Sequence, residues 1–158
     1  MILVDTDHLT VLKYLDSARC QALQARLAAT NEKRIGTTIV NVEEQMRGWL
    51  ASIAREKDMD RQIPAYRELA DLFRYFEHFH IVLFDRAAAE QFRQLRAAKV
   101  RIGTMDLKIA AVALVNRALL LRNPGVITSR FHRDPSGSIA WRGRATKYPF
   151  AYQKTEGF

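Results

Sequence analysis

Three acidic residues occupy comparable places along the chain. Asp5 directly follows a short apolar stretch that is predicted to be a strand, whereas Glu44 and Asp106 lie in the first turns of predicted helices. In a parallel sheet, the carboxyl ends of the strands and the amino ends of the following helices share one edge, so the three acids are expected to converge. Because ligands made only of oxygen suit hard cations, the pattern predicts a site for Mg²⁺ or Mn²⁺.

Converging carboxylates repel one another unless a cation neutralises them. A cation at such a site can orient a water for in-line attack on a phosphodiester and can neutralise charge on the scissile phosphate. A simpler interpretation also fits, because the helix dipole favours acids near helix N-termini. Asp7, close to Asp5, is predicted to cap a helix that begins at His8.

The elements that would position these acids alternate between strand and helix. Strands are predicted at residues 2–4, 35–40, 81–84 and 118–121. Helices are predicted at residues 9–29 with a break near Asp16–Ser17, and at residues 41–53, 65–79, 86–98 and 104–116. The alternation predicts an α/β protein with three layers and a short central parallel sheet.

Two further features of the predicted elements bear on packing. Residues 56–61 are predicted to be a charged connection. The helix at residues 65–79 is amphipathic, and its large apolar side chains on one arc are interpreted mainly as core. These side chains are Tyr66, Leu69, Leu72, Phe73 and Phe76.

The composition describes a basic globular protein. At 158 residues the chain is expected to form one domain, and its net charge of +8 predicts a polyanionic partner, most simply nucleic acid. A single cysteine, Cys20, and the lack of an apolar run of membrane-spanning length favour a cytoplasmic protein with no membrane contact. A basic face is interpreted either as a track for an RNA backbone or as a solvated surface. It consists of Arg93, Arg96, Lys99 and Arg101.

Three segments contain recognisable short motifs. The first is MILVDTDHLTVL, where a strand ends in an acid and Asp7-His8-Leu9 follows; the second is TTIVNVEEQMRGW, where Glu44 precedes Gly48 by four residues. The third is IGTMDLKIAAVALVNRALLL, which contains Asp-x-x-Ile-Ala-Ala from Asp106. Together these segments resemble the sequence blocks of PIN-domain proteins, and most of all the VapC-type toxins of bacterial toxin–antitoxin pairs. The resemblance covers roughly residues 1–121.

This resemblance implies a PIN-like α/β/α sandwich that acts as an endoribonuclease. Mg²⁺ or Mn²⁺ would be held by Asp5, Glu44 and Asp106, a metal-activated water would hydrolyse RNA, and the products would carry 5′-phosphate and 3′-hydroxyl ends. The resemblance also implies a homodimer and a VapB-type antitoxin whose C-terminal segment covers the acidic site. The antitoxin groove would be formed by Tyr14, Leu15, Tyr66, Phe73 and Phe76.

The chain departs from the family pattern after the core at residues 1–121. Residues 122–158 are interpreted as an atypical basic C-terminal segment of the same domain, in which Val126 stands where the family has a fourth acid. Three explanations stay open: Asp134 swings into the site, a single metal suffices, or the C-terminal sequence has been altered. Glu43 also stays open as an alternative to Glu44.

Two other functions compete with the nuclease hypothesis. The missing fourth acid suits a catalytically impaired PIN-fold protein that binds antitoxin or RNA without cutting. Asp5-Thr6-Asp7 after a strand also resembles the start of haloacid-dehalogenase-like phosphatases, in which the first Asp is a nucleophile. Leu9 breaks that second pattern, and no Gly-Asp-x-x-x-Asp motif follows.

Overall fold

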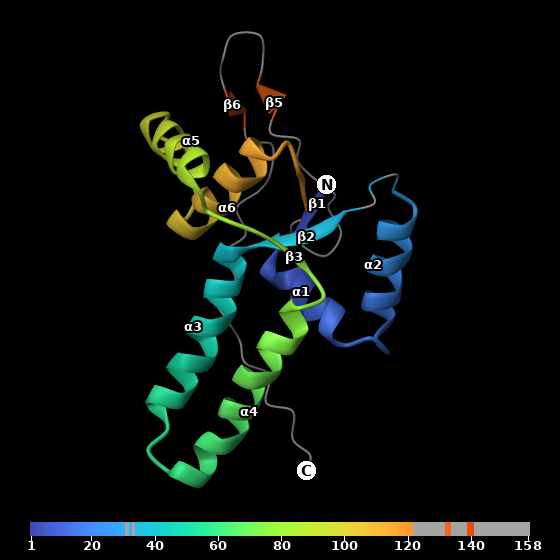
Figure 1. The fold of residues 1–158 in the computed structure, drawn as a ribbon, viewed down its shortest axis with the longest axis vertical. Coiled ribbons are helices and arrows are strands. Elements are labelled where there is room, and N and C mark those ends of the chain that lie inside the picture. Colours follow the sequence, from blue (N-terminus) through green and yellow to red (C-terminus); the bar gives the residue numbers. More distant parts are fainter. Residues whose placement is uncertain (31, 33, 122–131, 134–138, 141–158) are drawn as a thin grey trace.

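The computed structural model describes residues 1–30, 32, 34–121, 132–133 and 139–140 (Figure 1). The helices are α1 (Thr6–Lys13), α2 (Ala18–Ala28), α3 (Ile39–Arg55), α4 (Met59–Phe76), α5 (Arg86–Ala97) and α6 (Thr104–Val115). The strands are β1 (Ile2–Val4), β2 (Ile35–Thr38), β3 (His80–Val82), β4 (Leu119–Leu121), β5 (His132–Arg133) and β6 (Ile139–Ala140). None of the helices in this described part of the chain is long and apolar enough to cross a membrane.

The main sheet has four parallel strands in the order β3-β2-β1-β4. The two-residue strands β5 and β6 pair separately and antiparallel. In the main sheet β1 is an interior strand beside β4, and the backbone N–H of Asp5 donates to the carbonyl of Leu121 over 3.1 Å. The carboxyl ends of β1 and β4 therefore lie side by side, which confirms the predicted short parallel sheet.

Helices cover both faces of this sheet, as Figure 1 shows for α5 and α6 on one side and α1, α2 and α4 on the other. Side chains of a strand alternate between the two faces. Ile2 and Val4 accordingly pack in a core cluster with Leu72 of α4, whereas Leu3 packs in a second cluster with Val112 of α6. The predicted three-layer α/β/α arrangement is confirmed.

The start of α1 differs from the prediction in a way that matters for the site. The helix begins at Thr6, and Asp5 is its N-cap because the Asp5 carboxylate accepts a hydrogen bond from the Thr6 backbone N–H. The prediction that Asp7 caps a helix beginning at His8 is therefore wrong. Asp7 instead lies exposed in the first turn, where its charge suits the helix dipole.

Helix α4 is longer than its apolar pattern indicates. It begins at Met59, so the predicted connection at residues 56–61 is wrong at its C-terminal end; the Asp58 side chain caps the helix by accepting from two backbone N–H groups. The single arc predicted as core is also wrong in part. Leu72 and Phe76 are buried, but Tyr66 is 54% and Phe73 58% exposed.

Candidate functional site

Four residues lie close together where β1 is followed by α1 and β2 is followed by α3. We call these residues the acidic edge: Asp5, Thr6, Asn41 and Glu44. Thr6 joins the two acids, since its backbone N–H donates to Asp5 Oδ1 over 2.6 Å and its hydroxyl donates to Glu44 Oε2 over 2.8 Å. Asp5 is buried and Glu44 is half-buried. The predicted approach of Asp5 and Glu44 to one another is thus present, through a threonine that both contact.

The sequence predicts neither Thr6 nor Asn41 as a member of the acidic edge, and Asn41 is the more deeply buried of the two. Its side chain is fully buried, and Nδ2 donates to Asp5 Oδ1 and to Thr6 Oγ1, each over 3.1 Å. Its Oδ1 accepts from the Thr38 hydroxyl over 2.6 Å. Because Thr38 and Asn41 also form a capping box at the start of α3, the asparagine fixes the helix and the Asp5 carboxylate together.

The spacing of this capping box is the sequence signal that could have located Asn41. A helix start is indicated by a threonine followed three residues later by a side chain that can accept a hydrogen bond from the backbone N–H of that threonine. The sequence alone predicts a strand over the whole run IGTTIV, because this run is rich in β-branched residues. In the structure the strand ends at Thr38, and Ile39 and Val40 open the helix.

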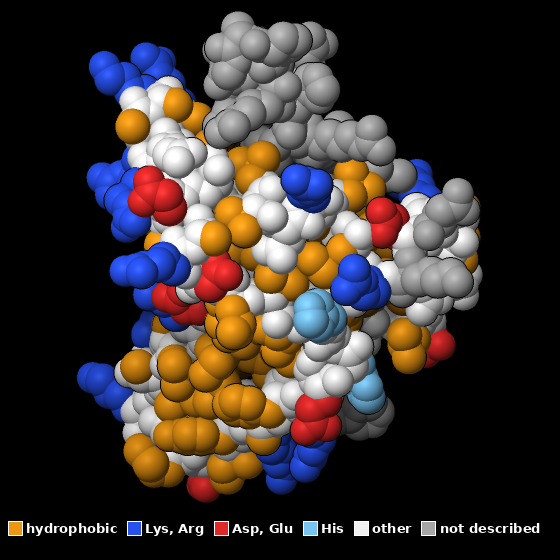
Figure 2. Space-filling model, turned by 45° about the horizontal axis from the view of Figure 1, so that its top comes forward, with side chains coloured by type: hydrophobic (Ala, Val, Ile, Leu, Met, Phe, Trp, Pro, Cys, Tyr) orange, Lys and Arg blue, Asp and Glu red, His pale blue; other side chains and the backbone are white. Residues whose placement is uncertain are grey.

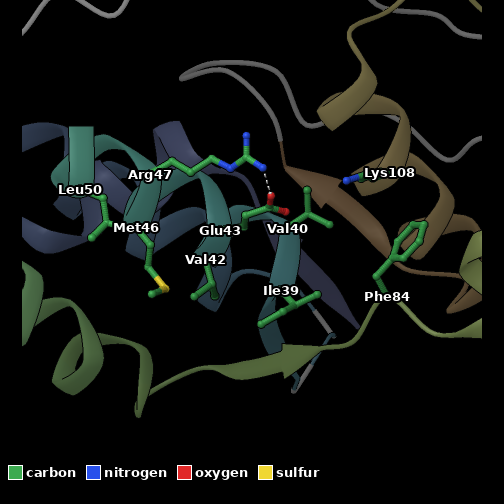
Figure 3. A pocket seen from close by; sticks show the side chains of 9 residues that line it. All are labelled: Ile39, Val40, Val42, Glu43, Met46, Arg47, Leu50, Phe84 and Lys108. Carbon is green, nitrogen blue, oxygen red and sulfur yellow. Dashed lines mark hydrogen bonds and ion pairs between the residues drawn. The ribbon is translucent and has the colours of Figure 1, made fainter. Parts of the chain in front are cut away.

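Glu43 and Glu44 point to different sides of α3. Glu43 Oε1 accepts from Arg47 Nη2 over 2.5 Å, an i,i+4 ion pair on the helix surface. Figure 3 shows this pair at the edge of a hollow that is also lined by Lys108. Of the two neighbours, Glu44 is the acid that contacts Thr6 and belongs to the acidic edge.

Asp106 lies in the first turn of α6 and is half-buried. A Cβ at Gly103, the N-cap position, would stand 3.3 Å from Asp106 Oδ2, so the carboxylate lies close over a residue with no side chain. The start of α6 also lies near α3, because Lys108 lines the same hollow as Val40 and Glu43. The carboxyl groups of Asp106 and of the acidic edge thus project from neighbouring helix starts.

The donor chemistry of these acids suits a hard cation, since every side-chain donor is a carboxylate oxygen. In the described ranges these acids do not form a complete metal site. No group of three or more His, Cys, Asp or Glu side chains there is gathered closely enough to hold a metal ion. Convergence of Asp5, Glu44 and Asp106 on one ion stays a prediction. The hypothesis of a fourth ligand concerns Asp134 and the position of Val126. Both residues lie outside the described part of the chain.

The four basic residues assigned to RNA contact are all exposed, but they differ in their surroundings. Arg93 is paired with Glu90 at 2.6 Å, and this hydrogen bond holds the pKa of the Glu90 carboxyl below its usual range. The Arg96 guanidinium lies over the Phe92 ring, 5.7 Å from its centre. Lys99 follows the end of α5 with a positive φ of 53°. The charge of Arg93 is therefore partly neutralised within the chain.

Of the residues assigned to an antitoxin groove, one does not fit that role. Phe76 is buried in the core beside Leu72, so it cannot line a surface groove, and this part of the prediction is wrong. Tyr14 and Leu15 are exposed at the turn between α1 and α2. Whether they contact a partner stays a prediction.

His8 is a buried histidine beside the acidic edge. Its Nδ1 has no hydrogen-bond partner among the described residues. Burial lowers the pKa of the imidazole, and the adjacent Asp7 carboxylate opposes only part of this shift. The folded protein therefore favours the neutral imidazole.

A pH dependence of stability follows from the lowered pKa of His8. Below the ordinary histidine pKa of about 6.5, the unfolded chain binds a proton that the folded chain binds less readily, so the unfolding free energy falls as the pH falls. His8→Leu is expected to lose less stability than the wild type between pH 7.5 and pH 5.5, measured by urea unfolding at both values. An equal loss in the two proteins would contradict the burial of a neutral imidazole.

Several solved structures share this fold. VapBC2 from Rickettsia felis, bound to a promoter DNA fragment, is 20% identical with a TM-score of 0.53, over 78% of this chain and 87% of that chain. A toxin–antitoxin complex from Klebsiella pneumoniae is 20% identical with a TM-score of 0.54, over 85% and 93%. FitAcB from Neisseria gonorrhoeae is 21% identical with a TM-score of 0.53, over 76% and 85%.

Comparison of the sequence itself gives no such match. No protein-family profile matches the chain, and no curated protein matches it. The likeness is therefore one of structure, and at these identities it concerns the arrangement of the elements. The chain has the PIN-like fold of VapC-type proteins.

Proposed function

We propose that this protein is a metal-dependent endoribonuclease of the VapC toxin type. The observation that carries the proposal is the acidic edge. There the Thr6 backbone N–H and the Asn41 amide both donate to the Asp5 carboxylate. The Thr6 hydroxyl accepts from Asn41 and donates to Glu44. The edge lies at the carboxyl end of the sheet, where parallel α/β folds place their active sites. The fold shared with toxin–antitoxin complexes supports the same function.

Asp5, Glu44 and Asp106 are the proposed ligands of Mg²⁺ or Mn²⁺. Such a cation supplies charge neutralisation at the scissile phosphate and lowers the pKa of a bound water. The chain's own contribution is to fix the donors: Asn41 and the Thr6 backbone orient the Asp5 carboxylate, and the Thr6 hydroxyl orients Glu44. Donors that are already fixed need no reorganisation when substrate binds. The proposed products are RNA ends with 5′-phosphate and 3′-hydroxyl groups.

The exposed cations of α5 and of the turn after it are the proposed contacts to the RNA backbone. Each phosphate contact to a single strand contributes about 0.7 to the slope of log affinity against log salt. We expect Arg96→Gln combined with Lys99→Gln to lower this slope by about 1.4, measured by fluorescence anisotropy with labelled single-stranded RNA in EDTA. Arg93→Gln is the matched control, with a smaller expected effect because Glu90 already pairs with Arg93. Equal slopes in all three proteins would exclude this face.

Two protein partners belong to the proposal. The first is a VapB-type antitoxin, a partner supported by the solved complexes of the same fold. The resemblance to VapC-type toxins implies that the C-terminal segment of this antitoxin covers the acidic edge. A second copy of the chain would form a homodimer.

One observation favours a second candidate function, a PIN-fold protein that binds antitoxin or RNA without cutting. Within the part of the chain that the structure describes, three acids do not gather closely enough to hold a metal ion, and Val126 occupies the sequence position of the fourth acid. Because the charge of a carboxylate cluster sets its affinity for a cation, such a set would bind metal weakly. Tight antitoxin binding without cleavage of any RNA class would support this alternative.

The two neighbouring glutamates provide a sharp test of the nuclease. Glu44→Gln keeps a side-chain oxygen that can accept from Thr6 but removes the charge, so cleavage should fall by at least about a hundredfold if that charge stabilises the transition state by several kcal/mol. Glu43→Gln is the control and should cut as the wild type does, because Glu43 pairs with Arg47 on another side of α3. Cleavage of labelled RNA with Mn²⁺ measures both. Loss in the Glu43 variant alone, or in neither, would overturn the assignment.

A further inference from the structure

A hollow lies between helix α3, the start of helix α6 and the chain that connects β3 to α5. Its volume is about 410 Å³, within the range of roughly 300–1,000 Å³ that is usual for small-ligand sites. Figure 3 shows side chains of α3 on one side of the hollow and Phe84 and Lys108 on the other. An apolar group of the size of a small ligand fits here, because most described residues of the lining are apolar: Ile39, Val40, Val42, Met46, Leu50 and Phe84.

The hollow carries an unbalanced positive charge. The charged side chains among its described lining residues are one acid, Glu43, and two cations, Arg47 and Lys108. Glu43 pairs with Arg47 at 2.5 Å, whereas Lys108 forms no ion pair within the part of the chain that the structure describes. Lys108 is also half-buried, so its ammonium group has lost part of its hydration and gains from an anionic partner. The hollow therefore suits a ligand that joins an apolar group to an anion.

The two helices that line the hollow also carry acids of the proposed metal site. On α3, Glu43 lines the hollow and the next residue, Glu44, belongs to the acidic edge. On α6, Lys108 lines the hollow and follows Asp106 by two residues. A ligand in the hollow is therefore a close neighbour of the acids that are proposed to hold the metal ion.

An aromatic pair connects the hollow with the cations of α5. The Phe84 ring packs edge to face on the Phe92 ring, with 6.3 Å between their centres, and the Arg96 guanidinium lies over the other side of this pair, 5.7 Å from the centre of Phe92. Figure 2 shows Lys and Arg side chains gathered along α5 beside an apolar area that is hollowed. Single-stranded nucleic acid suits this combination, because its bases bind apolar and aromatic groups while its phosphates follow the cations.

We propose that this hollow binds one unpaired nucleotide of the RNA substrate. The base enters between the Phe84 ring and the side chains of Val40 and Met46, and Lys108 contacts the phosphate of the same nucleotide. A base that is paired inside a duplex cannot enter the hollow, so the site selects RNA with unpaired bases. The C-terminus of a peptide also joins an apolar group to an anion, but it has no further phosphates for the cations of α5. The proposal rests on the proposed function for RNA as the substrate.

The test is the binding of adenosine 5′-monophosphate to the full chain in EDTA, followed by NMR of methionine methyl groups. Met46 lines the hollow, whereas Met59 is 69% exposed at the start of α4 and serves as the internal control. A bound base should shift the Met46 signal in a saturable way and leave the Met59 signal unchanged, because the ring current of a base acts only at short range. Ribose 5-phosphate has no base and is expected to bind on the order of tenfold more weakly, because it cannot stack.

Lys108→Met tests the anion contact, because it keeps an apolar stem and removes the charge. The affinity for both probes is expected to fall about tenfold, and Lys108→Arg is expected to retain it. Lys57→Met is the matched control, because Lys57 is exposed in the connection between α3 and α4. This control should bind as the wild type does.

Several results would overturn the proposal. Equal shifts of the Met46 and Met59 signals would show that the nucleotide does not enter the hollow, and an unchanged affinity of Lys108→Met would remove the phosphate contact. N-acetyl-leucine represents the C-terminus of a peptide, and tighter binding of this probe would assign the hollow to a protein partner. RNA cleavage is measured separately: a chain that cuts RNA but binds no nucleotide here keeps the nuclease function and loses this site. A chain that binds the nucleotide but cuts no RNA keeps the site and loses the nuclease function.

Discussion

Replacing Asp5 by asparagine is expected to remove nearly all RNA cleavage while leaving the protein folded. In the structure, Asp5 Oδ1 accepts hydrogen bonds from the Thr6 backbone N–H and from Asn41 Nδ2. An asparagine keeps that oxygen and therefore the N-cap, but it removes the charge that would hold a cation. If the cation contributes several kcal/mol to the transition state, the rate should fall by about two to three orders of magnitude.

Cleavage of labelled RNA under single-turnover conditions measures this effect, and thermal unfolding tests the fold. Asp7→Asn is the matched control, because Asp7 is exposed and stands two residues away in the same helix turn. It should cut at the wild-type rate. Undiminished cleavage by the Asp5 variant would remove Asp5 from the site, and an equal loss in both variants would point to a general effect of charge.

The second large effect is expected from Asn41→Ala, which should destabilise the protein as well as disable it. The substitution removes the donor to Asp5 and Thr6 and the acceptor for the Thr38 hydroxyl, all in a fully buried place. Buried polar groups left without partners cost about 1–3 kcal/mol each, so we expect a loss of roughly 2–4 kcal/mol. For a chain of this size, that lowers Tm by roughly 5–15 °C.

Asn116→Ala provides the comparison for this variant. Asn116 is an exposed asparagine whose amide donates to the Val112 carbonyl over 2.8 Å, so its loss exposes a group that water can satisfy. Differential scanning calorimetry should show a much smaller shift for Asn116→Ala than for Asn41→Ala. Similar shifts would mean that the buried network around Asn41 contributes little to stability.

The sequence carries enough information for the architecture because the fold depends on patterns that are local. Short apolar runs such as residues 2–4 alternate with amphipathic segments, and that alternation predicts the parallel sheet and the helices on both faces. The placement of Glu44 within the first two turns of a helix is local in the same sense. The approach of Asp5 and Glu44 follows from the shared edge of the sheet.

The features that the sequence did not disclose depend on competition between local preferences and tertiary contacts. Thr38 and Asn41 start a helix inside a β-branched run because their reciprocal hydrogen bonds outweigh strand propensity. Periodicity assigns Tyr66 and Phe73 to the same arc as Leu72, but in the structure only Leu72 of the three is buried. Periodicity shows which side chains share a face and does not show what, if anything, covers it.

The most direct test of the nuclease proposal is an RNA cleavage assay on the purified chain, free of antitoxin, with Mn²⁺ or Mg²⁺ and with EDTA. The Asp5→Asn protein runs beside the wild type to exclude a contaminating nuclease. The proposal predicts cutting with either metal that leaves 5′-phosphate ends, and no cutting in EDTA or in the variant. A folded wild type that cuts no RNA class with either metal would contradict it and would favour the alternative of a PIN-fold protein without nuclease activity.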